Sequence, residues 1–379
     1  MPTAAPVPPR SLLHREAWLR RGVSTRRLSG PGFIRVFPGY FTPSSAPTSL
    51  NSMAIVLQRG IAPGSVISHS TAAVLWGVPL PAQFENGVGL LSGVRYRSGN
   101  AVLTAAFVPE DGLLSATPRE LPPAPSSATP LQLPVLHAWA PPGGSSRTLR
   151  GATLHHSSTV RPSHMVMGVR VSPPLEVLAE LADQLPLWDL VATIDATVGP
   201  RGPVPRISLA AVIEHAENLT GRRGVANLRR AAGLAREKVE SPGETFVRLL
   251  VTDAGFPEPV PNLPTVHPRT GQQRRIDNGY RDLMIGLEYD GGWRSRSQDQ
   301  WRKDEARRDE LASYGWTICR QTGDDVQHPL AFLLRLRDVF CSRGLESLAP
   351  PLDRIHRAAR SLTSRNLSLR WNPPADASL

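Results

Sequence analysis

Two acidic residues follow directly on an apolar run of this chain. The run, Leu283-Met284-Ile285-Gly286-Leu287, is typical of a buried strand, and Glu288 and Asp290 stand at its end. Residues two apart in a strand share a face, so these two carboxylates are expected to point the same way. Because burying an unpaired carboxylate is costly, their position indicates a chemical use.

A third carboxylate, Asp277, lies on the preceding short strand, residues 274–277. If the two strands pair as a hairpin, Asp277 reaches Glu288 and Asp290. Converging carboxylates make an oxygen-rich pocket of the kind that Mg²⁺ or Mn²⁺ occupies, with Asp277 and Glu288 as the metal ligands. In a chain whose net charge is +11, the expected substrate is a phosphodiester, cleaved by metal-assisted hydrolysis.

An alternative reading of the same acids stays open. Asp277 and Glu288 could instead form a network of ion pairs with Arg275, Arg281 or Arg308, without any cation.

The elements that must position these acids can be predicted from spacing and capping. Ser241 is a typical helix cap, with Glu244 in the first turn of a helix over residues 242–254. After the two strands, the pattern predicts a charged helix over 298–314, a strand over 316–320 and a last helix over 328–340.

This order of elements resembles the restriction-endonuclease-like nuclease fold, and more closely a bacterial family related to very-short-patch-repair endonucleases. The resemblance covers about residues 241–340, and it rests on Ser241-Pro242-Gly243-Glu244, Arg275-Ile276-Asp277, Gly286-Leu287-Glu288-Tyr289-Asp290-Gly291, Asp304, Arg308 and Gly315-Trp316. It implies that Asp277 is the central metal ligand, that Glu288 is the second ligand and that Glu244 completes or orients the metal shell.

Two positions depart from the pattern of that family. Asp290 stands where many nucleases of the fold have a lysine, and Gly292-Trp293-Arg294 occupies the place of a histidine that relatives usually have. Arg294 is suited to stabilising a phosphate rather than to accepting a proton. The chain is therefore read either as a magnesium-dependent endonuclease or as a non-catalytic regulator with a degenerate nuclease fold.

The N-terminal region predicts a second nucleic-acid-binding element. Two short helices, the second over residues 25–28, precede a hairpin over 33–42, which is a winged helix-turn-helix pattern. On such a module Arg26 and Arg27 would enter the major groove of DNA, and Arg35 on the wing would contact a phosphate.

Residues 11–80 resemble the winged-helix domain of AbiEi-type antitoxins. The matching segments are Gly22-Val23-Ser24-Thr25-Arg26-Arg27-Leu28, Phe33-Ile34-Arg35-Val36-Phe37-Pro38-Gly39-Tyr40 and Ser68-His69-Ser70-Thr71-Ala72-Ala73-Val74-Leu75-Trp76-Gly77. Residues 151–198, with Gly168-Val169-Arg170-Val171-Ser172-Pro173, continue the pattern. The resemblance implies binding to operator DNA and a cognate toxin as partner.

Together these observations predict an α+β multidomain protein. We expect a winged helix-turn-helix over residues 11–80, a mixed α/β region over 81–240, a restriction-endonuclease-like α/β/α domain over 241–341 and a flexible tail over 342–379. The two cysteines lack metal-ligand spacing and exclude a disulfide framework. Since no run approaches transmembrane length and the N-terminus lacks a signal sequence, we expect a cytoplasmic protein without membrane association.

Overall fold

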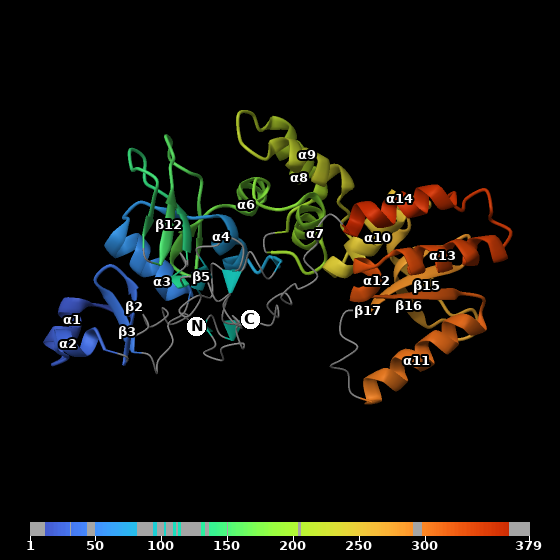
Figure 1. Cartoon of the computed structure of the whole chain (residues 1–379), viewed down its shortest axis with the longest axis horizontal. Coiled ribbons are helices and arrows are strands. Elements are labelled where there is room, and N and C mark those ends of the chain that lie inside the picture. The colour runs from blue at the N-terminus through green and yellow to red at the C-terminus, as the bar shows by residue number, and fades with distance from the viewer. Residues whose placement is uncertain are drawn as a thin grey trace. The chain divides into compact units, whose positions relative to one another are not determined.

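Helices and several separate β-sheets make up the structure, which is a computed structural model, so the chain has a mixed α/β fold (Figure 1). It describes residues 12–30, 32–43, 50–81, 136–149, 151–203, 206–290 and 298–363, together with five short strands between residues 94 and 132. The chain divides into two compact units: unit 1 comprises Met1–Leu181 with Asn372–Leu379, and unit 2 comprises Ala182–Trp371.

Unit 1 begins with two short helices beside a small antiparallel sheet. The sheet has the order β1-β3-β2, and its strands are β1 (Leu13–His14), β2 (Phe33–Phe37) and β3 (Tyr40–Pro43). Helix α1 (Arg15–Arg20) buries Trp18, whose ring nitrogen donates a hydrogen bond of 2.9 Å to the carbonyl of Phe41. The hydroxyl of Ser24 caps α2 (Thr25–Leu28). The predicted pair of short helices and the hairpin are thus present.

The larger part of unit 1 is built on a six-stranded sheet of mixed direction. Its order is β11-β12-β10-β4-β14-β13, and short helices α4 and α6 pack on each other beside it. The remaining described strands of this unit form two small sheets, β6-β5-β9 and β7-β8. The bounds of these elements are α3 (Leu50–Val56), a π-helical turn η1 (Leu57–Ile61), β4 (Val66–Ile67), α4 (His69–Leu75), β5 (Val94–Tyr96), β6 (Val102–Leu103), β7 (Pro109–Glu110), β8 (Leu113–Leu114), β9 (Pro130–Gln132), β10 (Leu136–Trp139), β11 (Arg147–Leu149), β12 (Ala152–His155), β13 (His164–Val166), β14 (Val169–Val171) and α6 (Pro174–Leu181).

Unit 2 combines a helical part with a four-stranded sheet. Helices α7 (Leu187–Val198), α8 (Leu209–Asn218) and α9 (Val225–Leu234) come first, and α10 (Pro242–Ala254) packs against both α7 and the sheet. The sheet has the order β15-β16-β17-β18, with a parallel pair between β17 and β18. The bounds of its strands and of the later helices are β15 (Val260–Val266), β16 (Gln273–Tyr280), β17 (Ile285–Asp290), α11 (Gln298–Ser313), β18 (Thr317–Thr322), α12 (Gly323–Gln327), α13 (Leu330–Ser342) and α14 (Leu352–Thr363).

Apolar side chains from strands and helices form the core around this sheet. Ile276, Leu287, Phe332 and Phe340 are at most 1 % exposed. Leu311 of α11 and Trp316 join Leu263 and Ile276 in one buried cluster. This core packs against β16 and β17, and three of the acids predicted to carry the chemistry, Asp277, Glu288 and Asp290, lie on these two strands.

The expected flexible tail needs a correction. Within residues 342–379 the structure describes helix α14, and Ile355, Ala358 and Ala359 of that helix are buried. The sequence looks polar there because α14 presents arginines on one face, while a narrow apolar stripe packs against α10 and α13. Among the helices that the structure describes, none has both the length and the apolar character needed to cross a bilayer.

Candidate active site

Strands β16 and β17 bring Asp277 and Glu288 to the same place. The strands pair antiparallel from Tyr280–Ile285 to Asn278–Leu287, as the predicted hairpin requires. Beyond this paired stretch, the carboxylate of Asp277 connects the two strands. It accepts a hydrogen bond of 3.0 Å from the backbone N–H of Tyr289. The carboxylate of Asp277 is thereby fixed beside the backbone of Glu288 and Tyr289.

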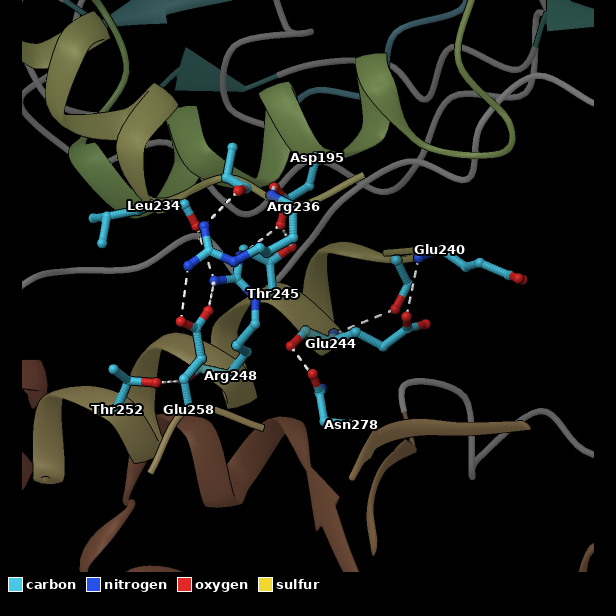
Figure 2. Close-up of polar contacts among 12 residues, drawn as sticks. Asp195, Leu234, Arg236, Glu240, Glu244, Thr245, Arg248, Thr252, Glu258 and Asn278 are labelled. Carbon is cyan, nitrogen blue, oxygen red and sulfur yellow. Dashed lines mark hydrogen bonds and ion pairs between the residues drawn. The ribbon is translucent and has the colours of Figure 1, made fainter. Parts of the chain in front are cut away.

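Helix α10 supplies Glu244 from its first turn. The hydroxyl of Ser241 caps the helix and Pro242 begins it, which is the arrangement that the sequence predicts. The Glu244 carboxylate accepts a hydrogen bond of 3.0 Å from the backbone N–H of Glu240. The side chain of Asn278 on β16 donates to the backbone carbonyl of Glu244, which ties the helix start to the strand that bears Asp277 (Figure 2).

A buried arginine one turn further along α10 holds the helix in place. The guanidinium of Arg248, 1 % exposed, forms ion pairs with Asp195 at 2.9 Å and with Glu258 at 3.2 Å. Asp195 of α7 also accepts a hydrogen bond from the hydroxyl of Thr245, the residue next to Glu244 (Figure 2). Because breaking a buried ion pair is strongly destabilising, this network fixes the position of the first turns of α10.

The acids line one half-open pocket of about 250 Å³. We call it the carboxylate pocket; it is lined by four acids and three arginines together with Tyr289, namely Glu244, Asp277, Glu288, Asp290, Arg307, Arg308 and Arg320. A larger cleft of about 620 Å³ shares Glu244, Asp277 and Arg307 with the pocket. The structure thus brings together all four acids that the sequence singled out.

Two of the acids are engaged by arginines in the pocket. Glu288 lies 3.0 Å from the guanidinium of Arg307 on α11, and Asp290 forms an ion pair with Arg320 on β18. Of the partners named in the alternative reading, Arg275 pairs with Glu240 and Arg281 donates to the carbonyl of Pro264. Arg308 pairs with Glu305, but it lines the pocket and its charge also acts on Glu288. Ion pairing is therefore real at this site, but with arginines that the sequence did not single out.

Burial, more than neighbouring charge, raises the pKa values of two acids in the pocket. Burial raises the pKa of Glu244 to about 7, and the neighbouring charge of Asp277 acts in the same direction. Burial also raises the pKa of Glu288, against the guanidinium of Arg307, and Asp277 again adds to the rise. Four carboxyl groups and three guanidiniums line the pocket, and one of the guanidiniums, that of Arg308, is shared with Glu305.

A divalent cation fits the chemistry of this pocket. Its donors are carboxylate oxygens, the ligands that Mg²⁺ and Mn²⁺ prefer, and the buried Oε1 atom of Glu288 accepts no hydrogen bond from any described residue. Within the described residues, however, no three histidine, cysteine or acidic side chains form a ready ligand set. Binding would therefore require Glu288 to exchange its arginine partner for the cation.

The predicted nucleic-acid contacts of the N-terminal region lie in unit 1. Arg26 and Arg27 are exposed on α2, and Arg35 is exposed on β2. Trp18 packs edge-to-face on Phe33, which fixes the short helices against the hairpin. Arg294, the fourth predicted contact, lies outside the residues that the structure describes.

Sequence reasoning missed Arg307 and Arg320 as members of the site. The register of the parallel pair sets Arg320 opposite Glu288, and Arg307 lies next to Arg308 on the charged helix. A signal for Arg320 did exist, since strand β18 is expected to run beside β17 in this order of elements. Nothing in the pattern of α11 distinguishes Arg307 from its charged neighbours.

Comparison with known proteins gives two curated relatives. They are named "Uncharacterized protein MT2308" and "Uncharacterized protein Rv2248", from the CDC 1551 / Oshkosh and the ATCC 25618 / H37Rv strains of Mycobacterium tuberculosis. Each is 28 % identical over 187 residues, which is 49 % of this chain, and the chain spans 66 % of the length of either relative. No family model matches the chain, and no solved structure matches it.

Proposed function

We propose that this chain is a DNA-binding protein whose unit 2 hydrolyses phosphodiesters with the help of Mg²⁺ or Mn²⁺. The observation that carries the proposal is the carboxylate pocket, where Glu244, Asp277 and Glu288 meet beside three arginines. The order helix, hairpin, charged helix, strand and helix around the pocket supports a restriction-endonuclease-like fold for this part of the chain.

Asp277 and Glu288 are the proposed cation ligands, and Glu244 orients them from α10. Held by Asp277 and Glu288, a divalent cation would polarise the phosphate, lower the pKa of a water molecule and offset charge on the leaving oxygen. Asp290, buried and paired with Arg320, keeps the end of β17 in place rather than accepting a proton. The guanidinium of Arg308, which lines the pocket, is suited to bind the oxygens of a phosphate.

Unit 1 is the proposed docking module for DNA. The helices α1 and α2 with the β2–β3 hairpin support a winged helix-turn-helix arrangement, with Arg26 and Arg27 toward the bases and Arg35 toward a phosphate. The net charge of +11 supports a polyanionic partner. On this proposal the protein works in the cytoplasm without a membrane, and a cognate toxin is a second partner if the antitoxin resemblance holds.

A plasmid-cleavage assay tests the hydrolase proposal. Supercoiled plasmid is incubated with the full chain and Mg²⁺ or Mn²⁺, and nicked and linear products are followed. We expect cleavage by the wild type and a loss of about a hundredfold or more in Asp277→Asn, because a lost cation ligand removes several kcal/mol of transition-state stabilisation.

The matched control is Asp282→Asn. Asp282 is an exposed acid in the turn between β16 and β17, so the same chemical change there leaves the carboxylate pocket intact. Cleavage that survives in Asp277→Asn as well as in the control would remove hydrolysis from this pocket.

A second function is favoured by the arginines in the pocket. Because Arg307 and Arg320 hold Glu288 and Asp290, and because an aspartate stands where related nucleases have a lysine, unit 2 could bind nucleic acid without cleaving it. The protein would then be a transcriptional regulator of the antitoxin type. Sequence-specific binding to operator DNA with no cleavage in either cation would favour this function.

A further inference from the structure

Charged side chains of helix α11 make several contacts with the sheet of unit 2. Among its described side chains, Leu311 alone is fully buried. Glu310 forms an ion pair of 2.7 Å with Arg274 of β16, and Arg307 reaches both Glu288 and the backbone carbonyl of Arg275. The position of this helix therefore depends on which partners its charged side chains find.

Arg307 stands where the carboxylate pocket meets the larger cleft, since it lines both. Its guanidinium lies 3.0 Å from Oε1 of Glu288, whose side chain is 15 % exposed. The same oxygen belongs to one of the two proposed cation ligands. A guanidinium and a divalent cation cannot both occupy the space in front of this oxygen.

We propose that Arg307 is the resident counterion of Glu288, and that a divalent cation displaces it toward the larger cleft, where it binds a phosphate of the nucleic-acid strand. This inference rests on the proposed function. The displaced guanidinium is planar and always charged, which suits it to a phosphate. The cleft that receives it is also lined by Arg274 and Arg275.

Two consequences follow from this exchange. Arg307 competes with the cation, so removing it strengthens cation binding to the protein without nucleic acid. Arg307 also couples the binding of the cation to the binding of nucleic acid. A phosphate that binds the displaced guanidinium leaves Glu288 available to the cation. By thermodynamic reciprocity, the cation then strengthens nucleic-acid binding by the same factor as nucleic acid strengthens cation binding.

The test measures Mn²⁺ affinity of the full chain from the electron paramagnetic resonance signal of unbound Mn²⁺. We expect Arg307→Ala to bind Mn²⁺ about fivefold more tightly than the wild type, since an ion pair of moderate strength no longer opposes binding. Arg302→Ala, which removes an exposed arginine of the same helix, serves as the control and leaves the affinity unchanged. Equal or weaker Mn²⁺ binding in Arg307→Ala overturns the inference.

A second measurement examines the coupling. Adding a short oligonucleotide is expected to raise the Mn²⁺ affinity of the wild type and to leave that of Arg307→Ala unchanged; an equal rise in both overturns the coupling. Arg307→Gln, which keeps most of the stem that packs on the sheet, is measured beside Arg307→Ala, and thermal unfolding confirms that both variants fold.

The failure of this inference differs from the failure of the proposed function. Mn²⁺ binding that Asp277→Asn abolishes and Arg307→Ala leaves unchanged overturns the competition alone. Mn²⁺ binding that Asp277→Asn does not reduce overturns both, because the cation then lies outside the carboxylate pocket.

Discussion

Single residues set the charge of the carboxylate pocket, and Asp290 shows how. It is 4 % exposed and pairs with Arg320, which the register of the parallel strands places opposite Glu288. An aspartate at this position would add to the repulsion among Glu244, Asp277 and Glu288 if the arginine of the neighbouring strand did not neutralise it. The ion pair with Arg320 therefore supports a positioning role for Asp290. Glu244, Asp277 and Glu288 remain as the acids beside which a cation would bind.

Asp189 of α7 is a buried acid that the pocket does not use. Its side chain is fully buried, and among the described residues neither carboxylate oxygen has a hydrogen-bond partner. Burial raises the pKa of Asp189 from 3.8 to about 7. The folded protein therefore retains this proton up to about pH 7, whereas the unfolded chain releases it near pH 3.8, so the acid lowers the free energy of unfolding progressively across that window.

We expect Asp189→Asn to raise the free energy of unfolding at pH 8 by about 2 kcal/mol, because the amide stays neutral where the acid must ionise. The gain should shrink toward zero as the pH falls to 4. Urea unfolding at pH 4, 6 and 8, followed by tryptophan fluorescence, measures it. Asp183→Asn, a change at an exposed acid, is the control, and a gain for Asp189→Asn that is the same at all three pH values would contradict the assignment.

At the scale of elements, periodicity and capping predicted most of unit 2. The apolar run 283–287, the cap at Ser241 and the charged helix all appear within a few residues of their predicted bounds. Strand β15 was missed because Pro261 and Pro264 argue against a strand. It lies at the edge of the sheet, the place in a sheet where strands tolerate proline.

The arginine partners of the acids were harder to predict for a physical reason. Several arginines lie within reach of the pocket by sequence, and differences of a few ångströms decide which one meets which acid. Such differences come from the packing of α11 and β18 on the sheet, and local propensity does not record them. The four acids were predictable because strand alternation and a helix cap each fix a side-chain direction locally.

Packing against Tyr289 explains why a glycine, Gly243, stands in the Ser-Pro-Gly-Glu segment at the start of α10. A Cβ atom at this position would lie 2.0 Å from two ring atoms of Tyr289, so the start of the helix can approach β17 only because Gly243 has no side chain. The close approach brings Glu244 of the helix to the pocket lined by Glu288 and Asp290 of the strand.

We expect Gly243→Ala to lower the free energy of unfolding by about 1–3 kcal/mol, because the added methyl group overlaps the partly buried ring of Tyr289, which must move. It should also weaken Mn²⁺ binding, since Tyr289 lies between Glu288 and Asp290. Denaturant unfolding and Mn²⁺ titration measure the two effects.

Gly233→Ala in helix α9 is the matched control for this prediction. A Cβ atom at Gly233 meets no atom within 4 Å, so alanine there should stabilise the helix by up to about 1 kcal/mol. Opposite signs at the two glycines would support the close approach, and equal effects would contradict it.

For the whole molecule, the proposal assigns two functions to two compact units. Arg26 and Arg27 belong to unit 1, whereas Asp277 belongs to unit 2. Sequence reasoning separated these regions by the type of motif in each, and a domain boundary near residue 80 stays a prediction. Sequence reasoning could not assign α14 to unit 2. The apolar stripe of that helix is narrow, and its packing against α10 and α13 is known only from the structure.

Because residues without shared partners act independently, the two functions should be separable by mutation. We expect Arg26→Ala/Arg27→Ala to weaken DNA binding in EDTA by about tenfold or more and to relax its sequence preference, because both arginines are proposed to contact bases. The same double variant should keep the Mn²⁺ affinity of the wild type. Asp277→Asn should lose Mn²⁺ binding and keep DNA binding in EDTA, and the triple variant should show the sum of both losses.

Gel shifts and Mn²⁺ titrations supply the two readouts, with Arg222→Ala/Arg223→Ala in unit 2 as a control for the change in net charge. A loss of Mn²⁺ binding in Arg26→Ala/Arg27→Ala would show that the two sites do not act as separate modules. An equal loss of DNA binding in the control would show that net charge alone drives binding to DNA.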